Sequence, residues 1–252
     1  MWRVILERLR QKHRTHGYPA EAPVMPGRFQ GRPVVDNNTV AGAEGPVACC
    51  PTAALAIGPD HRLRLDAGKC LFCGECTKAC GQHGVRFTQE HRLAAARRED
   101  LVIKGGEEHL ADALNKEAAR LFGRSLKLRQ VSAGGCNACE ADTNVLNTLV
   151  FDLGRFGIQF VASPRHADGL LVTGPVTKNM ELALRKTYEA VPSPKIVIAV
   201  GACAISGGLF AGHDETFRGV GDILPVDLFI PGCPPHPWTI LDGLLRVLGK
   251  LR

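Results

Sequence analysis

The sequence has no apolar run that approaches the roughly 20 residues needed to span a bilayer as a helix. Charges interrupt its first ten residues, where a secretory signal peptide would carry an uninterrupted apolar segment. Glycine fingerprints for dinucleotides or phosphates and a nucleophile–base arrangement are missing as well. These absences argue against a membrane-spanning chain and against the common nucleotide-dependent enzymes. We expect a cytoplasmic protein that is not itself the seat of bond-making.

Signals for nucleic-acid binding are also lacking, although the formal net charge is +6. No recognition motif and no interleaving of aromatic and basic residues accompany this charge, so we expect no nucleic-acid partner. Much of the charge lies near the start of the sequence, where apolar residues stand at helical spacing among basic ones. This segment contains the apolar Trp2, Ile5, Leu6 and Leu9 and the basic Arg3, Arg8, Arg10, Lys12 and Arg14.

The segment predicts a short amphipathic basic helix over 2–14. Such a helix can pack on its own domain, dock on a partner or lie on an anionic membrane surface. The core or a partner is favoured over lipid, because one short apolar stripe gives only weak membrane affinity. Residues 16–48 are rich in Pro, Gly and Asn, and we expect them to run as an extended arm.

Ten cysteines are the most informative residues of the chain. In a reducing compartment thiols stay free, and clusters of them usually bind metal or carry out redox chemistry. Cys70, Cys73 and Cys76 follow the C-x₂-C-x₂-C spacing of bacterial ferredoxins. In that pattern the next cysteine, here Cys80, points away from the cluster, and the missing corner comes from a preceding Cys-Pro. Cys50, followed by proline, is therefore the predicted fourth ligand.

The cysteines left over in this region are Cys49 and Cys80, which we predict to be non-ligands. Reading back from Cys50 at the ferredoxin spacing gives Pro46, Ala43 and Val40 where a second cluster would need cysteines, so that cluster is lost. The alternative is a structural zinc site, which also uses four cysteines. Zinc motifs usually pair two C-x₂-C knuckles, so the spacing of Cys70, Cys73 and Cys76 favours an iron–sulfur cluster over zinc.

Beyond position 124 apolar, β-branched strands alternate with helices, which predicts an α/β fold with a flavodoxin-like, doubly wound parallel sheet over 125–252. Residues 1–124 are predicted to hold the arm, a ferredoxin-like iron–sulfur domain and a connector helix over 108–121. The predicted strands are 126–131, 158–162, 169–172, 195–200 and 226–230, and the predicted helices are 140–156, 178–190 and 238–251.

Three further cysteines, Cys136, Cys203 and Cys233, each come just after the carboxyl end of a predicted strand. Because ligands bind at that edge of open α/β sheets, these thiols and the nearby Cys139 are expected to meet in one crevice. Glycines around them let the backbone approach a bulky group. Four inert core cysteines are the alternative, which this placement disfavours.

The motifs of the second half resemble a known family. Gly135-Cys-Asn-Ala-Cys-Glu, together with the segments 155–158, 162–168, 171–177, 201–208 and 226–235, is similar to the small subunit of energy-converting, membrane-bound [NiFe] hydrogenases, including formate hydrogenlyase. That family shares ancestry with the cluster-bearing 20 kDa subunit of NADH:quinone oxidoreductase. The resemblance covers about 127–248. The first half, with Cys50-Pro-Thr-Ala-Ala and the 69–76 segment, resembles the ferredoxin-like iron–sulfur subunit of the same complexes, so two subunits look fused.

The resemblance implies two [4Fe–4S] clusters, one held by Cys50, Cys70, Cys73 and Cys76 and a proximal one held by Cys136, Cys139, Cys203 and Cys233. It also implies a large [NiFe]-type catalytic partner, together with further iron–sulfur and membrane subunits. These would keep the chain on the inner face of the cytoplasmic membrane and make it an electron-transfer subunit.

Asn137 and Ala138 separate the first two proximal cysteines as in hydrogenases, whereas these cysteines are adjacent in quinone reductases. A quinone-reducing or nickel-free relative is the alternative reading, and a zinc-stabilised scaffold is a remote one. Glu140 stands where family members carry an acid that can relay protons, and its alternative is a solvated acid at a helix N-terminus. The same two interpretations apply to Asp142.

Overall fold

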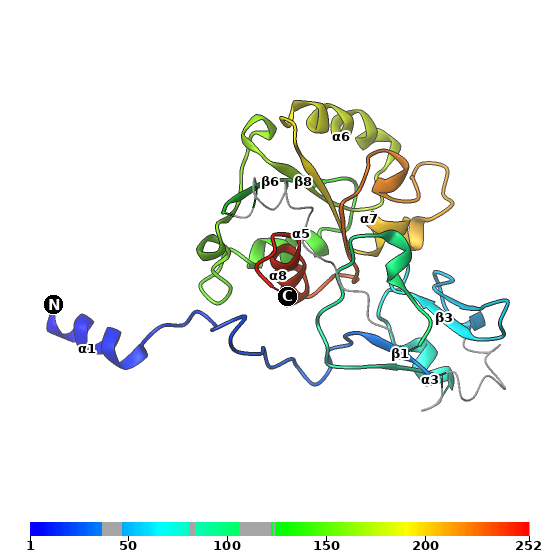
Figure 1. The fold of residues 1–252 in the computed structure, drawn as a ribbon, viewed down its shortest axis with the longest axis horizontal. Helices are drawn as coiled ribbons and strands as arrows, with labels where there is room; N and C mark the ends of the chain where they lie inside the picture. The colour runs from blue at the N-terminus through cyan, green and yellow to red at the C-terminus, as the bar shows by residue number, and fades with distance from the viewer. Residues whose placement is uncertain (37–46, 81–83, 106–121, 123, 252) are drawn as a thin grey trace.

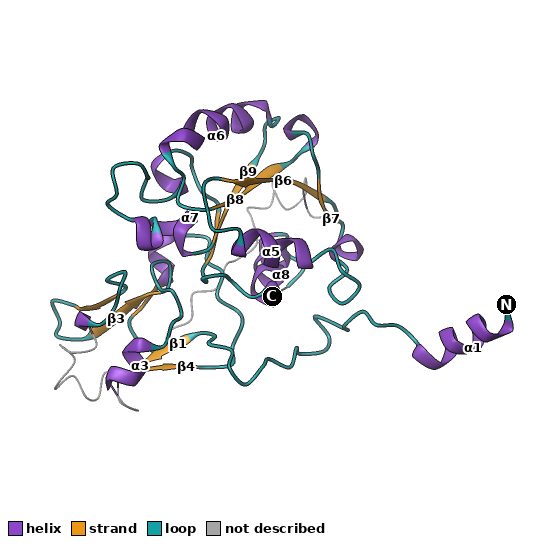
Figure 2. Cartoon of the chain, turned by 180° about the vertical axis from the view of Figure 1, so that it is seen from behind, coloured by secondary structure: helices purple, strands orange, loops and turns teal. Residues whose placement is uncertain are grey.

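The computed structural model describes residues 1–36, 47–80, 84–105, 122 and 124–251 of the chain. A parallel sheet with helices on both faces makes up the larger part, and two small antiparallel sheets lie beside it (Figure 1). Figure 2 shows the same arrangement from behind, with the first helix, α1 (Trp2–Gln11), standing away from both parts. The predicted connector helix over 108–121 lies outside the described residues.

The larger sheet has five parallel strands in the order β10-β9-β8-β6-β7. Counted along the chain from β6, this is the order 2-1-3-4-5 of flavodoxin-type folds, which confirms the predicted doubly wound parallel sheet. Every strand lies within two residues of its predicted range. The strands are β6 (Leu126–Ser132), β7 (Ile158–Phe160), β8 (Gly169–Thr173), β9 (Ile196–Val200) and β10 (Leu228–Ile230).

Helices cover both faces of this sheet (Figure 1). The predicted helix over 178–190 is found with those bounds, whereas the last one ends at Val247, before its predicted end at 251. There the backbone N–H of Lys250 turns back to the carbonyl of Leu245. The helices are α5 (Ala138–Val145), α6 (Lys178–Ala190), α7 (Ala202–Ser206) and α8 (Pro237–Val247).

Alternate residues of the central strands face the two helical layers. Leu170 and Val172 of β8 belong to a buried cluster that contains Leu184 of α6. Leu171, which points to the other face, lies in a second buried cluster with Leu241 of α8. This alternation buries both faces of the strands, which explains why they read as continuous apolar runs in the sequence.

The helix predicted over 140–156 is shorter than expected. α5 ends at Val145, and a separate 3₁₀ turn follows at Leu153–Phe156. Thr143, Asn144, Asn147 and Thr148 stand around this end, and such side chains compete with helical hydrogen bonds. The backbone accordingly changes to i→i+3 bonds such as Thr148 N–H to the Val145 carbonyl, and Asp152 takes a left-handed conformation.

The first half of the chain forms two small antiparallel sheets that share a core with the larger sheet. The backbones of Ala95 and Phe229 exchange two hydrogen bonds, so this segment borders the β10 edge. A ferredoxin-like fold for this part stays a prediction, as does the domain boundary at 124. Its elements are β1 (Pro33–Val35) paired with β4 (Val85–Phe87), a sheet in which β3 (Leu63–Asp66) lies between β2 (Leu55–Ile57) and β5 (Val102–Ile103), and the helix α3 (Glu75–Cys80).

The segment after α1 runs along the larger part as an extended chain, as predicted for the first part of the arm, and residues 37–46 of the predicted arm lie outside the described residues (Figure 1). The backbone N–H of His16 donates to the Val150 carbonyl, and the buried Tyr18 hydroxyl donates to Asp242 of α8. α1 itself buries none of its residues, so it is not packed on the core. Among the described residues no helix has the length and apolar character to cross a bilayer.

Candidate metal centres

Four cysteines meet at the carboxyl edge of the larger sheet, as the sequence predicted for their strands. Cys136 follows β6, Cys139 lies in the first turn of α5, Cys203 begins α7 after β9, and Cys233 follows β10. We call these four the sheet-edge thiols. Burial raises the pKa of Cys139, and negative charge on Glu140 and on the other three thiols raises it further. That electrostatic coupling shows that loops far apart in sequence place these sulfurs together.

The sheet-edge thiols surround the switch point of the fold. β6 lies between β7 and β8, so the chain leaves β6 toward one side of the sheet and returns on the other. Ligands of open α/β sheets bind in the crevice that this reversal opens. Gly174 after β8 has φ +83°, and a Cβ there would stand 2.5 Å from the backbone N of Gly135. Only glycine lets the two loops meet at this point.

Gly201 leaves the space beside one of the sulfurs. Its φ is +91°, and a Cβ on it would lie 2.6 Å from Sγ of Cys139. Cys136 and Cys233 are exposed, whereas Cys139 and Cys203 are half-buried, so the group faces outward on one side. Four thiols with glycine-lined room beside them fit a [4Fe–4S] cluster, which takes four cysteine thiolates.

Three of these thiols, Cys139, Cys203 and Cys233, have a raised pKa when free and so favour their protonated form. Burial, followed by the charges of Cys233 and Cys136, raises the pKa of Cys203 to about 11. Bound iron would reverse this preference, because a metal binds the thiolate and releases the proton. In the described part of the chain no three His, Cys, Asp or Glu side chains converge tightly enough to hold a single metal ion.

A second group consists of Cys50, Cys70, Cys73 and Cys76, which we call the N-terminal thiols. All four line one pocket, whose walls include Leu65 and other apolar side chains. These are the four residues that the ferredoxin spacing predicts as ligands. Cys70 and Cys76 are buried, Cys50 is half-buried and Cys73 is exposed. The set of donors again fits a [4Fe–4S] cluster.

Backbone N–H groups point at the sulfurs of this pocket. The N–H of Ala54 donates to Sγ of Cys50 at 3.2 Å, and the N–H of Phe72 donates to Sγ of Cys70 at 3.3 Å. Ala53 and Phe72 have positive φ, at 46° and 54°, which turns these loops around the sulfurs. Such hydrogen bonds stabilise charge on cluster sulfurs and tune the reduction potential.

These donors act differently on the individual thiols. Burial alone would raise the pKa of Cys50, but hydrogen bonds from Thr52 and from the backbone of Ala54 outweigh it and lower the pKa. Burial dominates at Cys70 and raises its pKa to about 12, and it raises the pKa of Cys76 to about 11.

Of the two cysteines predicted as non-ligands, only Cys49 has a described side chain, and it lies within electrostatic reach of Cys50 and Cys73, which line this pocket. Cys49 is half-buried and does not line it. Cys80 is the last residue of α3, and its side chain lies outside the described part of the chain. The predicted roles of both residues therefore stay predictions.

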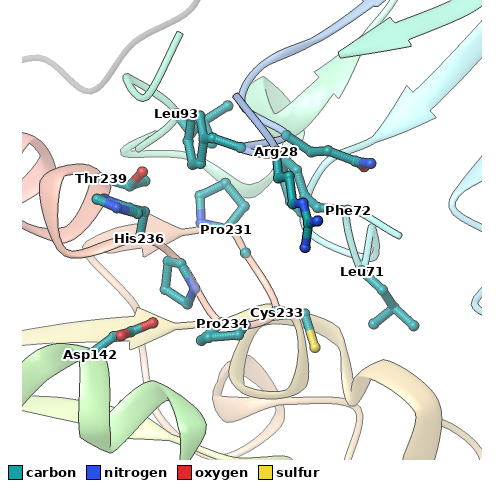
Figure 3. Close-up of a pocket in the computed structure, with 14 residues that line it drawn as sticks. Arg28, Leu71, Phe72, Leu93, Asp142, Pro231, Cys233, Pro234, His236 and Thr239 are labelled. Atoms are coloured by element: carbon teal, nitrogen blue, oxygen red, sulfur yellow. The ribbon is translucent and has the colours of Figure 1, made fainter. Parts of the chain in front are cut away.

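A pocket lies between the sheet-edge thiol Cys233 and the loop that carries two of the N-terminal thiols (Figure 3). Leu71 and Phe72, from the loop of the N-terminal thiols, line it together with Cys233, Asp142 and His236. Burial raises the pKa of the Cys233 thiol, and the charges of Cys136 and Cys73 add to that effect. Cys73 and Cys233 are thus within electrostatic reach of each other, which places one predicted cluster beside the other.

Glu140 lies beneath the sheet-edge thiols rather than in solvent. Its side chain is only 6% exposed, and Oε1 accepts hydrogen bonds from the hydroxyls of Ser132 and Thr173, the latter at 2.7 Å. The alternative of a solvated acid is therefore wrong for Glu140. Asp142, two residues further along α5, is half-buried and lines the pocket, and burial raises its pKa.

The two hydroxyl partners of Glu140 were not predicted from the sequence. Ser132 ends β6 and Thr173 ends β8, and the two residues are paired in the register of adjacent parallel strands. Polar residues at the carboxyl ends of parallel strands meet at one edge of the sheet, and the rule that predicted the meeting of the cysteines applies to these two hydroxyls as well.

The part of the chain that carries the sheet-edge thiols matches known proteins. Residues 136–247 match the family described as NADH ubiquinone oxidoreductase, 20 Kd subunit. A probable membrane-bound hydrogenase subunit, mbhJ, of Pyrococcus furiosus is 45% identical over 141 residues, which cover 55% of this chain and 84% of that protein. Formate hydrogenlyase subunit 7 of Escherichia coli is 45% identical over 128 residues, or 51% of this chain and 50% of that protein. A subunit of the NADH-quinone oxidoreductase of Citrifermentans bemidjiense is 44% identical over 117 residues, or 46% of this chain and 68% of that protein.

Proposed function

This chain belongs to the family of the 20 kDa subunit of NADH ubiquinone oxidoreductase, and we propose on that premise that it is an electron-transfer subunit of a membrane-associated [NiFe] hydrogenase complex of the formate hydrogenlyase type. Its sheet-edge thiols hold a proximal [4Fe–4S] cluster beside a separate large catalytic subunit. Its N-terminal thiols hold a second [4Fe–4S] cluster, and each cluster supplies a site that takes up and releases one electron.

The observation that carries this proposal is the proximity of the two groups of thiols across one pocket. Charge on Cys73 adds to the raised pKa of Cys233, and Leu71 and Phe72 line one pocket with Cys233, so electrons have a short path between the two sites within one chain. Cys136 and Cys233 are exposed, which leaves the proximal site open to a partner subunit. The chain itself provides the ligands, the N–H donors to sulfur and the separation between the sites.

Hydrogenase is preferred over quinone reductase because of the two residues between the first pair of sheet-edge thiols. Asn137 has φ +70° and starts α5, so Cys136 lies in the loop and Cys139 in the helix. The related quinone-reducing and nickel-free complexes are the second candidate, since a subunit of an NADH-quinone oxidoreductase is 44% identical to this chain over 117 residues. The large subunit encoded with this chain decides between them, because a nickel site needs paired C-x-x-C motifs there.

Glu140 has the placement of a proton relay in this proposal. Hydrogen bonds from two hydroxyls hold its buried side chain at the ends of β6 and β8, and its charge raises the pKa of Cys139 and of Cys203. In the whole complex, Glu140→Gln should slow proton-coupled turnover while the clusters are still reduced at the normal rate. A complex that turns over normally with this variant would remove Glu140 from the relay.

The decisive experiment counts metals in anaerobically purified protein. Two [4Fe–4S] clusters predict a brown protein with broad absorption near 400 nm and roughly eight irons per chain. Cys50→Ser should bring the count to about four, whereas Cys80→Ser should leave it near eight. Colourless protein with stoichiometric zinc would overturn the redox function and support the zinc-stabilised scaffold instead.

We place the complex on the inner face of the cytoplasmic membrane, with partner subunits of the iron–sulfur and membrane-embedded kinds. An assembly of several chains is supported by two relatives, one named as a membrane-bound hydrogenase subunit and the other as a formate hydrogenlyase subunit. Fractionation of cells that express the complex should recover the chain with membranes, on the side that protease reaches only after the membrane is opened.

A further inference from the structure

The first helix has an apolar face that the rest of the chain leaves open. Trp2 is 78% exposed, Leu6 62% and Leu9 69%, and no residue of α1 is buried. Both views show α1 standing away from the two folded parts at the end of the arm (Figures 1 and 2). The proposed electron transfer does not involve this helix, so its apolar face needs a different explanation.

The side chains of α1 are sorted into three zones around the helix axis. At about 100° per residue, Trp2, Ile5, Leu6 and Leu9 fall within an arc of roughly 100°. Cations border this arc on both sides, at comparable angles from its centre. The bordering cations are Arg3 and Arg10 on one side and Arg8 on the other.

The side opposite the apolar arc is mainly polar, with one apolar residue, the exposed Val4. Glu7 and Gln11 lie there, and Nε2 of Gln11 donates a 2.6 Å hydrogen bond to Oε1 of Glu7. The helix therefore carries its single acid as far as possible from the apolar arc and its arginines next to it. In this arrangement long cationic side chains can extend from the edges of a buried apolar face to a layer of negative charge.

We propose that α1 lies in the interface of an anionic lipid bilayer, with its apolar face among the acyl chains and its arginines at the lipid phosphates. A bilayer surface presents phosphates on both sides of an embedded helix, which matches cations on both borders. An acidic groove on a protein would need two parallel rows of carboxylates to do the same. Trp2 adds an aromatic ring of the kind enriched at membrane interfaces.

The fold also places an exposed apolar loop, the one after α5, near the attachment point of α1. The arm is attached to the body at the loop after α5, where the N–H of His16 donates to the carbonyl of Val150 at 3.0 Å. On this loop Leu149 is 75% exposed and Val150 is 45% exposed. Only residues 12–15 separate α1 from that attachment, so a surface that binds α1 lies close to Leu149 as well.

The consequence is a direct contact between this chain and lipid, in addition to the contacts made through partner subunits. The contact is weak and reversible, because one short helix buries little apolar area. It depends on salt, since each Lys or Arg near an anionic surface raises binding on the order of fivefold.

Binding of the full, anaerobically purified chain to lipid vesicles tests this proposal. Vesicles of phosphatidylcholine alone are compared with vesicles of equal parts phosphatidylcholine and phosphatidylglycerol, at low and high salt. Co-sedimentation gives the bound fraction, and tryptophan emission gives the location. The chain has two tryptophans, and Trp238 is only 5% exposed, so a blue shift on binding reports Trp2.

Three variants make the test specific. Leu6→Glu interrupts the apolar face and should lower binding on the order of tenfold. The double change Arg8→Glu with Arg10→Glu should lower it at least about 25-fold. Leu182→Glu is the matched control, because this leucine is 68% exposed on α6, away from the proposed face, and should change nothing.

The proposal holds if anionic vesicles bind the chain in a salt-sensitive way, with a blue shift that the α1 variants lose. Equal binding to both kinds of vesicle, no binding, or unchanged binding of Leu6→Glu would each overturn it. Loss of the large subunit on purification of α1 variants, without vesicle binding by the normal chain, would assign the face to a protein partner instead. Iron content and absorption near 400 nm, read in the same samples, show separately whether the proposed redox function holds.

Discussion

Cys73 and Cys233, from different halves of the chain, lie close enough that charge on the first raises the pKa of the second, after the larger effects of burial and of Cys136. The relationship joins a loop of the small antiparallel part to the carboxyl edge of the parallel sheet. Leu71 and Phe72 line the pocket between them together with Cys233. The two candidate metal centres therefore lie side by side within one chain.

This proximity predicts magnetic interaction between the two reduced clusters. In the fully reduced protein, electron paramagnetic resonance spectra should show signals that are broadened or split by the neighbouring spin. Cys70→Ser should remove the N-terminal cluster and leave one narrow signal from the sheet-edge cluster. Sharp, independent signals in the protein with both clusters would contradict the placement of Cys73 beside Cys233.

Gly201 predicts a specific loss of the sheet-edge cluster. A methyl group there would lie 2.6 Å from Sγ of Cys139, and φ +91° disfavours any side chain. Gly201→Ala should therefore displace Cys139 and lower the iron count from about eight to about four per chain. Gly221→Ala is the control, because a Cβ at that glycine meets nothing within 4 Å. Full iron content in Gly201→Ala would show that the loop can shift without losing the cluster.

Glu140 predicts a change in reduction potential. Its charge is the second cause, after burial, of the raised pKa of Cys139, so it opposes added negative charge at the sheet-edge thiols. Glu140→Gln keeps an oxygen for Ser132 and Thr173 but removes the charge, and reduction becomes easier. We expect the midpoint potential to rise on the order of 40 mV, equivalent to about 1 kcal/mol for one electron.

Redox titration followed by electron paramagnetic resonance measures that potential. Asp142→Asn is the matched control, an acid-to-amide change on the same helix whose charge is not among the causes of the shift at Cys139. If both variants raise the potential equally, the effect reflects overall charge and not the position of Glu140.

Much of this architecture could be predicted from the sequence because local patterns specify it. Buried parallel strands such as β8 read as continuous apolar runs, and the rule for their carboxyl ends places Cys136, Cys203 and Cys233 at one edge. The spacing of Cys70, Cys73 and Cys76 is equally local, and Cys50 follows from the ferredoxin pattern.

Other features depend on contacts that no local pattern contains. The burial of Glu140 depends on hydroxyls at the ends of two strands, and its place in the first turn of a helix left a buried relay and a solvated acid equally open. The open apolar face of α1 is similar, because helical spacing shows that a face exists but not what covers it. The end of α5 at Val145 is decided by side-chain competition over several residues, which periodicity does not detect.

Tyr18 predicts how the stability of the chain changes with pH. Its hydroxyl donates a 2.7 Å hydrogen bond to Oδ1 of Asp242, whose Oδ2 accepts from Arg246 at 2.7 Å. Burial, then the charge of Asp242, raises the pKa of Tyr18 far above its ordinary value. The folded chain therefore keeps this proton at a pH where the unfolded chain loses it. The resulting stabilisation is complete below pH about 10 and is lost as the pH rises above that value.

Tyr18→Phe removes both the hydrogen bond and the titrating group. At neutral pH the variant should lose about 1–2 kcal/mol, or roughly 3–6 °C in apparent unfolding temperature under anaerobic conditions. Above pH about 10 the stability of the variant should fall less steeply than that of the normal chain, so the difference in stability between the two becomes smaller. Tyr188→Phe is the control: it retains Tyr18, and its stability should fall with pH as that of the normal chain does. If the stability of Tyr18→Phe falls as steeply above pH about 10 as that of the normal chain, groups other than Tyr18 govern the alkaline unfolding.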